Sequence, residues 1–272
     1  MSRRDRLVTF ALLAPTVGAL VLLFGGGLLG AARQSLQPGL SGGLSGSAWH
    51  TVYRDPVFRD AVWFSARVAL EATAISAVIA VLAALALRRH GTLARSLFAL
   101  PVPVPHLLVA VIAVLWLAPG GLADRLLDGL PVSFVHDRAG AGIVLVYVYK
   151  EAPFLALLLL ATMGQALAQR EEAAAVHGAD WLRRLRWVVW PAIRRPLTIG
   201  GLIVGAFTFG AFEVPLVVGP SYPPTIATYA LQATQGDVIG GQSVAAAALL
   251  VAAAASFALA AAVVGVGRGA GE

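Results

Sequence analysis

Long apolar stretches alternate along the chain with short polar segments rich in arginine. The hydrocarbon core of a bilayer is about 30 Å thick, so a helix needs roughly 20 apolar residues to cross it while satisfying its own backbone polar groups. Six stretches meet or approach that length. We therefore predict an all-α integral membrane protein with six transmembrane helices in a single transmembrane domain, residues 1–272; the predicted spans are residues 7–32, 61–87, 96–118, 140–166, 196–218 and 244–267.

Ionisable side chains interrupt several predicted spans, and in hydrocarbon such groups are costly and mark either a solute pathway or a pair. Arg67 and Glu71 lie four residues apart and share a helix face, which favours a structural pair. Lys150 and Glu151 are adjacent and point roughly 100° apart around a helix, so each needs a partner of its own. These four residues are candidates for lining a pathway through the membrane.

Two further pathway candidates lie at the ends of predicted spans. Glu213 is near the outer end of the fifth span, two residues before Pro215, which removes a helical hydrogen bond and is expected to kink the backbone. Its carboxylate either attracts a cationic solute or reaches water or a helix partner at the interface. His106 follows Pro105 at the start of the third span and either lines a cavity or packs with a hydrogen bond.

The basic residues predict the orientation of the spans, because cytoplasmic loops retain an excess of arginine and lysine. With the amino terminus inside, thirteen basic residues fall in inner segments and five in outer loops. Both termini and the segment 166–196 are therefore expected in the cytoplasm. A cleavable signal peptide is the competing interpretation of the first span, although its uncharged run is about twice the usual length of 7–15 residues.

Composition excludes several kinds of function. The chain is 58% hydrophobic and 12% charged, and its net charge of +6 is dispersed among the spans, which argues against a nucleic-acid-binding face. The absence of cysteine excludes disulfides and thiolate chemistry. The five histidines lie far apart, without the spacing of metal ligands, and the phosphate-binding pattern Gly-x-x-x-x-Gly-Lys-Ser/Thr is missing. We expect no metal and no cofactor in this chain.

The segment 166–196, which we call the loop 166–196, predicts two short helices joined at a glycine. Residues 166–176 are good helix formers, and Gly178 is a suitable place for that helix to end. Asp180 is a candidate N-cap for a second amphipathic helix, which Pro191 is expected to end. The alternative is a basic amphipathic helix lying on lipid headgroups, which suits the tryptophans at positions 181, 187 and 190.

The spacing within this loop resembles a known signature. Glu172-Ala173-Ala174 is followed after three residues by Gly178, and after nine more by Val188-Val189-Trp190-Pro191. This resembles the coupling loop of MetI-like permeases, the membrane subunits of binding-protein-dependent ABC importers. Residues 149–154 and 191–196 are similar to the flanks of that signature. The chain departs from it by His177 for Asp, Leu185 for a frequent Phe, Val188 for Ile and Trp190 for Leu.

The resemblance implies a transport subunit rather than an enzyme, in the bacterial cytoplasmic (inner) membrane. It implies an ATP-binding cassette ATPase dimer that holds ATP and magnesium, a second permease subunit, homologous or identical, and an extracytoplasmic solute-binding protein, besides membrane lipid. No nucleic acid is expected. The residues expected to couple this subunit to the ATPase are Glu172, Ala173, Ala174, Gly178, Ala179, Trp181, Leu185, Val188 and Pro191.

We expect a solute of the polyamine, thiamine, iron(III) and phosphonate group, with a carbohydrate as the alternative. Residues 212–220 and 223–226 look like permeases for polyamine, thiamine, iron(III) or phosphonate, whereas Leu13-Ala14-Pro15 and Gln34-Ser35-Leu36 look like carbohydrate permeases. Two other functions are weighed against import driven by ATP. A proton-coupled secondary transporter would use Lys150, Glu151 and Glu213. An integral membrane enzyme would need an acid and base pair from Glu213, Glu151 or His106, and no convincing spacing for one is present.

Overall fold

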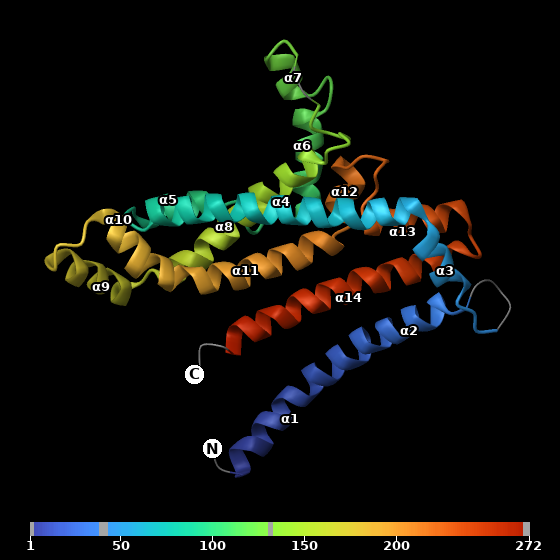
Figure 1. Cartoon of the computed structure of the whole chain (residues 1–272), viewed down its shortest axis with the longest axis horizontal. Coiled ribbons are helices and arrows are strands. Elements are labelled where there is room, and N and C mark those ends of the chain that lie inside the picture. The colour runs from blue at the N-terminus through green and yellow to red at the C-terminus, as the bar shows by residue number, and fades with distance from the viewer. Residues whose placement is uncertain (1–2, 38–42, 130–132, 269–272) are drawn as a thin grey trace. The chain divides into compact units, whose positions relative to one another are not determined.

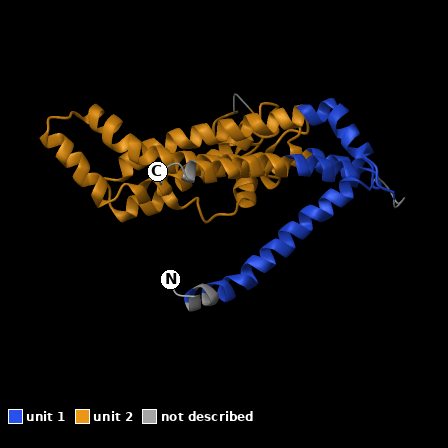
Figure 2. Ribbon diagram, turned by 60° about the horizontal axis from the view of Figure 1, so that its bottom comes forward, with its two compact units in different colours: residues 1–59, 229–251 blue, residues 60–228, 252–272 orange. Residues whose placement is uncertain are grey.

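A computed structural model describes residues 3–37, 43–129 and 133–268, and the regular elements in these ranges are all helices (Figure 1). The chain divides by its internal contacts into two compact units (Figure 2). Unit 1 consists of residues 1–59 and 229–251, and unit 2 of residues 60–228 and 252–272. The all-helical fold class is confirmed, and the expectation of a single transmembrane domain stays a prediction.

Unit 1 contains the amino-terminal helices. A continuous helix runs through α1 (Arg3–Leu20), the π-helical turn η1 (Val21–Gly25) and α2 (Gly26–Ser35). The unit also holds α3 (Ser47–Arg54), the carboxyl-terminal part of α13 (Ile226–Gly236) and the first part of α14 (Gly241–Arg268). The most apolar window of the span Thr9–Ser35 buries none of its residues within the chain. Its apolar side chains are therefore available to lipid or to another protein.

Unit 2 is built around the central helix α8, which packs against α11, α6 and α12. Much of α8 is buried, including both of its charged residues. The helices of this unit besides the last part of α14 are α4 (Pro56–Leu87), α5 (Thr92–Ala99), α6 (His106–Leu117), α7 (Leu122–Leu126), α8 (Ala141–Thr162), α9 (Gln165–Val176), α10 (Trp181–Arg184), the π-helical turn η2 (Leu185–Val189), α11 (Trp190–Gly210) and α12 (Glu213–Val218).

Two apolar clusters on α8 form most of the core of unit 2. One joins α4, α6, α8 and α12 around the buried Ile143 and Tyr147. The other joins α4, α8 and α11 around Leu155 and Leu159. Gly200 lets α11 approach α8, since a Cβ at this position would lie 2.7 Å from side-chain carbons of both Leu155 and Leu158. The two helices are consequently held together closely along this contact.

Within the described residues, five helical stretches are long and apolar enough to cross a membrane, and each overlaps one of the predicted spans. They are Thr9–Ser35, Pro56–Leu87, His106–Leu126, Ala141–Thr162 and Gly241–Gly265. The third begins later than the predicted span 96–118, because α5 ends at Ala99 and the prolines at 101, 103 and 105 interrupt the helix before His106.

The predicted span 196–218 is not one continuous helix. The chain is helical from Trp190 to Gly210, breaks at Ala211 and Phe212, and resumes as α12 at Glu213. The expected kink at Pro215 takes the form of a full break at Ala211, whose carbonyl lies four residues before this proline, and Pro215 itself is the third residue of α12, where the loss of a backbone N–H costs little. The number of six membrane-spanning helices stays a prediction.

Candidate functional site

The loop 166–196 folds as two helices around a tight turn, at one end of unit 2 (Figure 1). The first helix, α9, ends at Val176, and Gly178 turns the chain with φ at +82°, a conformation that costs glycine almost nothing. Asp180 caps the next helix, because its Oδ1 accepts a hydrogen bond from the backbone N–H of Arg183 at 2.8 Å. The predicted N-cap is confirmed.

The second helix of the loop does not end at Pro191 as expected. It runs from α10 through η2 directly into α11, with Pro191 at the beginning of α11. A proline clashes with the carbonyl four residues earlier, here that of Trp187, and the wider π-helical turn over residues 185–189 relieves this constraint. The loop is thus joined by unbroken helix to α11.

The residues expected to couple to an ATPase lie on both faces of this loop. Glu172, Ala173, Gly178, Trp181 and Pro191 are exposed. Ala174, Ala179, Leu185 and Val188 are half-buried, and η2, which carries Leu185 and Val188, packs against α9. The exposed set is accessible to a partner, whereas Leu185 of the half-buried set packs against the core cluster around Leu155 and Leu159.

An ion pair that the sequence did not predict fixes the loop to the end of α4. Arg88 Nη1 lies 2.7 Å from Glu171 Oε2, and both side chains are largely buried. Its neighbour Glu172 is exposed and makes no ion pair among the residues that the structure describes. The two adjacent carboxylates therefore differ in role: one anchors the loop, and the other faces outward. Glu171 lies 83 residues from Arg88 in the chain, so the sequence alone gave no signal of this ion pair.

Lys150 is 4% exposed and is held by backbone carbonyl groups. Its ammonium group donates to the carbonyl oxygens of Pro101 at 2.7 Å and Val102 at 2.9 Å, and also to that of Val104. These carbonyls belong to the proline-rich break between α5 and α6, where the helical hydrogen-bonding pattern is lost. Lys150 thus stabilises the broken segment rather than pointing to open space.

Glu151 pairs with His106, which begins α6. Nε2 of His106 lies 2.9 Å from Oε1 of Glu151, and the imidazole also stacks against the rings of Phe207 on α11 and Tyr147 on α8, at centroid distances of 5.0 and 6.0 Å. The Tyr147 hydroxyl has no hydrogen-bond partner among the described residues. This group of four residues, which we call the His106 cluster, brings three helices together, and the sequence had not included the two aromatic residues.

Three further pathway candidates make no hydrogen bond or ion pair with this cluster among the described residues. Arg67 Nε is 3.9 Å from Glu71 Oε1 on α4, so the predicted pair forms, although at a long distance. Arg67 also donates to the carbonyl of Ala139 at 2.5 Å. Glu213 is exposed at the start of α12, beyond the break that follows α11. Its carboxylate makes no hydrogen bond or ion pair with the residues that the structure describes.

Sequence comparisons match the chain to membrane transport proteins. It is 31% identical over 208 residues to the inner membrane ABC transporter permease protein YnjC of Escherichia coli, a match that covers 73% of this chain and 39% of the relative. It is 28% identical over 173 residues to the sulfate transport system permease protein CysW of Escherichia coli, covering 61% of this chain and 58% of the relative. The chain belongs to the ABC-transporter permeases. No protein-family model matches it.

Other matches to this permease carry different solutes in their names. The trehalose transport system permease protein SugA of Mycobacterium tuberculosis and the thiamine transport system permease protein ThiP of Salmonella typhimurium are 31% and 29% identical to it, over 61% and 63% of its length. They are matched over 55% and 33% of their own lengths. The permease thus spans less than two thirds of each of the curated relatives named here.

The fold of the permease matches solved structures over nearly its whole length. A chain of the bacterial alginate ABC transporter, crystallised with an alginate pentasaccharide-bound periplasmic protein, aligns with a TM-score of 0.77 at 19% identity. The match covers 98% of the permease and 95% of that chain. At this low identity the likeness establishes the fold alone, and the solute of the permease must be inferred separately.

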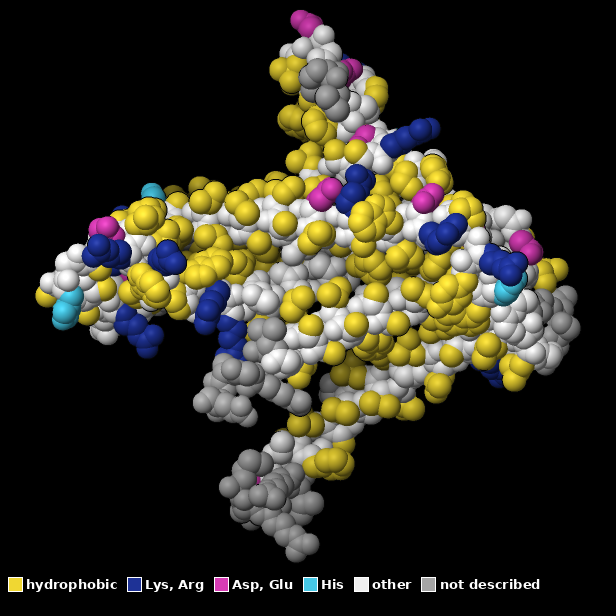
Figure 3. Space-filling view, in the orientation of Figure 1, with side chains coloured by type: hydrophobic (Ala, Val, Ile, Leu, Met, Phe, Trp, Pro, Cys, Tyr) yellow, Lys and Arg dark blue, Asp and Glu magenta, His cyan; other side chains and the backbone are white. Residues whose placement is uncertain are grey.

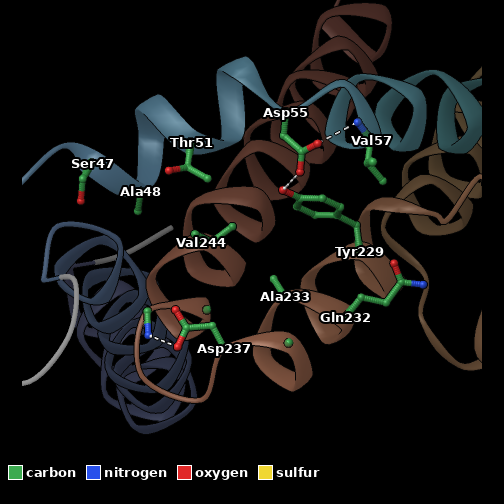
Figure 4. A pocket seen from close by; sticks show the side chains of 13 residues that line it. Ser47, Ala48, Thr51, Asp55, Val57, Tyr229, Gln232, Ala233, Asp237 and Val244 are labelled. Atoms are coloured by element: carbon green, nitrogen blue, oxygen red, sulfur yellow. Dashed lines mark hydrogen bonds between the residues drawn. The ribbon is translucent and has the colours of Figure 1, made fainter.

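A cleft of about 490 Å³ lies within unit 1, between α3, α13 and α14 of the permease (Figure 4). Asp55 accepts hydrogen bonds from the Tyr229 hydroxyl at 2.7 Å and from the backbone N–H of Val57 at 2.8 Å. Burial, and then the bond to Asp55, raise the pKa of Tyr229. Backbone N–H groups of Gly240 and Ile239 lower the pKa of Asp237. Asp55 thus holds the start of α4 and the side chain of Tyr229 in place, and Asp237 holds the turn that follows it.

Proposed function

We propose that this permease is the membrane-spanning subunit of a binding-protein-dependent ABC importer. It forms part of the translocation pathway for a small solute and has no catalytic chemistry of its own. An ATPase dimer that binds ATP and magnesium, a second permease, homologous or identical, and an extracytoplasmic solute-binding protein complete the assembly. Family membership supports this proposal, and so does the crystal structure of a similar fold, whose transporter is in complex with a periplasmic protein.

The observation that carries the coupling mechanism is the unbroken helix from the loop 166–196 into α11. α9 packs against η2, and the Arg88–Glu171 pair ties α9 to the end of α4, so the loop moves as one body. α11 in turn packs against α8 and carries Phe207, which contacts His106. A displacement of the loop by an ATPase therefore reaches the His106 cluster through packed helices, without a flexible joint between them.

ATP binding and hydrolysis would drive transport through a shift in conformational population. The ATPase dimer closes in one nucleotide state, and because it binds the loop 166–196, closure favours one of two arrangements of the spans. Glu213, at the far end of α11 beyond the break, and the His106 cluster are the polar groups we propose to meet the solute. Lys150 instead holds the α5–α6 break, and we assign it a structural role within the pathway wall.

Two solute classes are supported equally. Similarity to the thiamine permease favours the polyamine, thiamine, iron(III) and phosphonate group, whereas similarity to the trehalose permease and the fold of the alginate transporter favour carbohydrates. The exposed carboxylate of Glu213 suits a cationic solute of the first group. A thermal-shift screen of the solute-binding protein encoded beside the permease distinguishes the two classes by which ligands raise its melting temperature.

We expect the variant Glu172→Lys to lose ATP-driven uptake while inserting normally. Glu172 is exposed on a helix that is fixed at Glu171, so reversal of its charge leaves the fold intact and opposes a basic partner group. Loss of a charged pair at an interface costs about 2–5 kcal/mol, so binding of the ATPase should weaken about 30-fold or more. The measurements are solute uptake in proteoliposomes and co-purification of the ATPase.

The control is Gln235→Lys, which adds a lysine at an exposed helical position of α13, far from the loop in sequence. It should keep uptake and ATPase binding. Normal uptake by Glu172→Lys would refute the docking role of this residue. Uptake by the wild-type permease without nucleotide would instead favour a proton-coupled secondary transporter.

A further inference from the structure

A second surface of the loop 166–196 forms one wall of a groove that faces the end of α4. The groove has a volume of about 750 Å³ and is mostly apolar. Leu82 and Leu85 line it from α4, and Leu182, Trp190 and Ile193 line it from the loop and α11. Leu82 and Leu182 are 62% and 65% exposed, and Trp190 is 46% exposed. So much exposed apolar surface in one groove indicates that something covers it.

Basic side chains surround this groove, and acidic ones are missing from its described lining. Arg88, Arg89 and Arg186 all line it. Arg88 is engaged with Glu171, but Arg89 is exposed and makes no hydrogen bond or ion pair among the described residues. Arg186 lies 5.4 Å from the ring of Trp187. Figure 3 shows Lys and Arg side chains interspersed with apolar ones at the end of unit 2 that carries α9 and α10.

The position of the groove beside a candidate membrane span indicates which kind of molecule occupies it. Leu82 and Leu85 belong to the last turns of the candidate membrane span Pro56–Leu87, so this wall continues the apolar surface of that span. Arg88 and Arg89 directly follow the end of that span, where a charged side chain can reach lipid headgroups, and Arg186 lines the opposite side of the groove from η2. An apolar wall in the bilayer with free guanidinium groups and tryptophans at its boundary matches an acyl chain joined to an anionic headgroup.

We propose that this groove binds an anionic phospholipid. The phosphate lies between Arg89 and Arg186, and an acyl chain lies along Leu82, Leu85 and Ile193. The lipid then fills the space between α4 and the second helix of the loop. The exposed face of α9 around Glu172 then remains for the ATPase, whereas Trp181 and Leu185, which the sequence placed in the coupling set, line the lipid groove. This inference goes beyond the proposed import function and does not depend on the solute.

The test uses the full-length permease in detergent, titrated with phosphatidylglycerol and with phosphatidylcholine and observed by native mass spectrometry. We expect the double variant Arg89→Gln/Arg186→Gln to weaken phosphatidylglycerol binding about 30-fold, as expected for two arginines near the headgroup, and to leave phosphatidylcholine binding unchanged. The matched control is Arg170→Gln/Arg183→Gln, which removes the same charge from exposed positions of the same loop outside the groove lining. It should bind phosphatidylglycerol as the wild type does.

Three results would overturn the proposal. Equal weakening by the control pair would show a general charge effect rather than a site. Displacement of phosphatidylglycerol by soluble glycerophosphoglycerol would show that a free anion suffices, without the apolar groove. A change from dimer to monomer in the Arg89→Gln/Arg186→Gln variant, with phosphatidylglycerol binding unchanged, would identify a second copy of the chain as the occupant. Melting temperatures equal to that of the wild type exclude misfolding as the cause.

Discussion

Replacing Lys150 with methionine should destabilise the permease by about 2–4 kcal/mol, because it removes a buried donor that three carbonyl oxygens share. The ammonium group of Lys150 satisfies the carbonyls of Pro101, Val102 and Val104 at the break between α5 and α6. Methionine fills a similar volume and donates no hydrogen bond. The measurements are the melting temperature in detergent and the rate of proteolysis within residues 100–105, and we expect the first to fall and the second to rise.

The control for this variant is Glu151→Gln, one residue further along α8. Its amide oxygen can still accept a hydrogen bond from His106, so we expect a much smaller change in stability. If Lys150→Met melted like the wild type and altered only uptake or solute preference, Lys150 would be a pathway residue, as the sequence alone had suggested. The structural role of Lys150 at the break between α5 and α6 would then be refuted.

Replacing Gly178 with leucine should abolish most ATP-driven uptake while the protein still inserts. The φ of +82° at this turn is strained for leucine, so relief of the strain reorients α10 relative to α9 and moves Glu172 away from its partner. A Cβ at Gly178 meets no atom within 4 Å, so the effect comes from the backbone rather than from a clash. Uptake in proteoliposomes and ATP hydrolysis stimulated by the solute-binding protein are the measurements.

Gly178→Asn is the matched variant for this prediction. Asparagine tolerates the left-handed conformation far better than leucine, although its side chain also extends into the open space beside the turn. It should retain most of the uptake. If both variants lost uptake equally, a side chain at this position would itself block docking, and if both kept it, the geometry of the turn would not matter for coupling.

The sequence predicted the fold class and the helical turn of the loop well, because both depend on local signals. Uncharged runs long enough to cross a bilayer indicate helices, and Gly178 and Asp180 mark a helix end and a helix start. The proline signals were less reliable. Pro191 and Pro215 were expected to end or kink helices, yet both lie near the start of a helical segment, where proline is tolerated.

Most of what positions the candidate site depends on contacts between residues far apart in the chain, which a single sequence does not reveal. The pair Arg88–Glu171 and the partner of Glu151, His106, each join different helices. Hydropathy identified Lys150 as unusual, but its role follows from the backbone break that it faces. Tyr147 and Phe207 look like ordinary core residues in the sequence, and only their packing around His106 distinguishes them.

A single-cysteine cross-link shows whether the loop 166–196 docks on a separate ATPase. The chain contains no cysteine, so Glu172→Cys introduces a unique thiol, and Gln235→Cys on α13 serves as the control. Each variant is labelled with a photoactivatable maleimide in membranes that also contain the ABC ATPase encoded with the permease. We predict a cross-link to the ATPase from position 172 and none from position 235. Labelling of position 172 by a membrane-impermeant maleimide from the extracytoplasmic side, with no ATPase cross-linked, would show that the loop 166–196 does not dock on an ATPase.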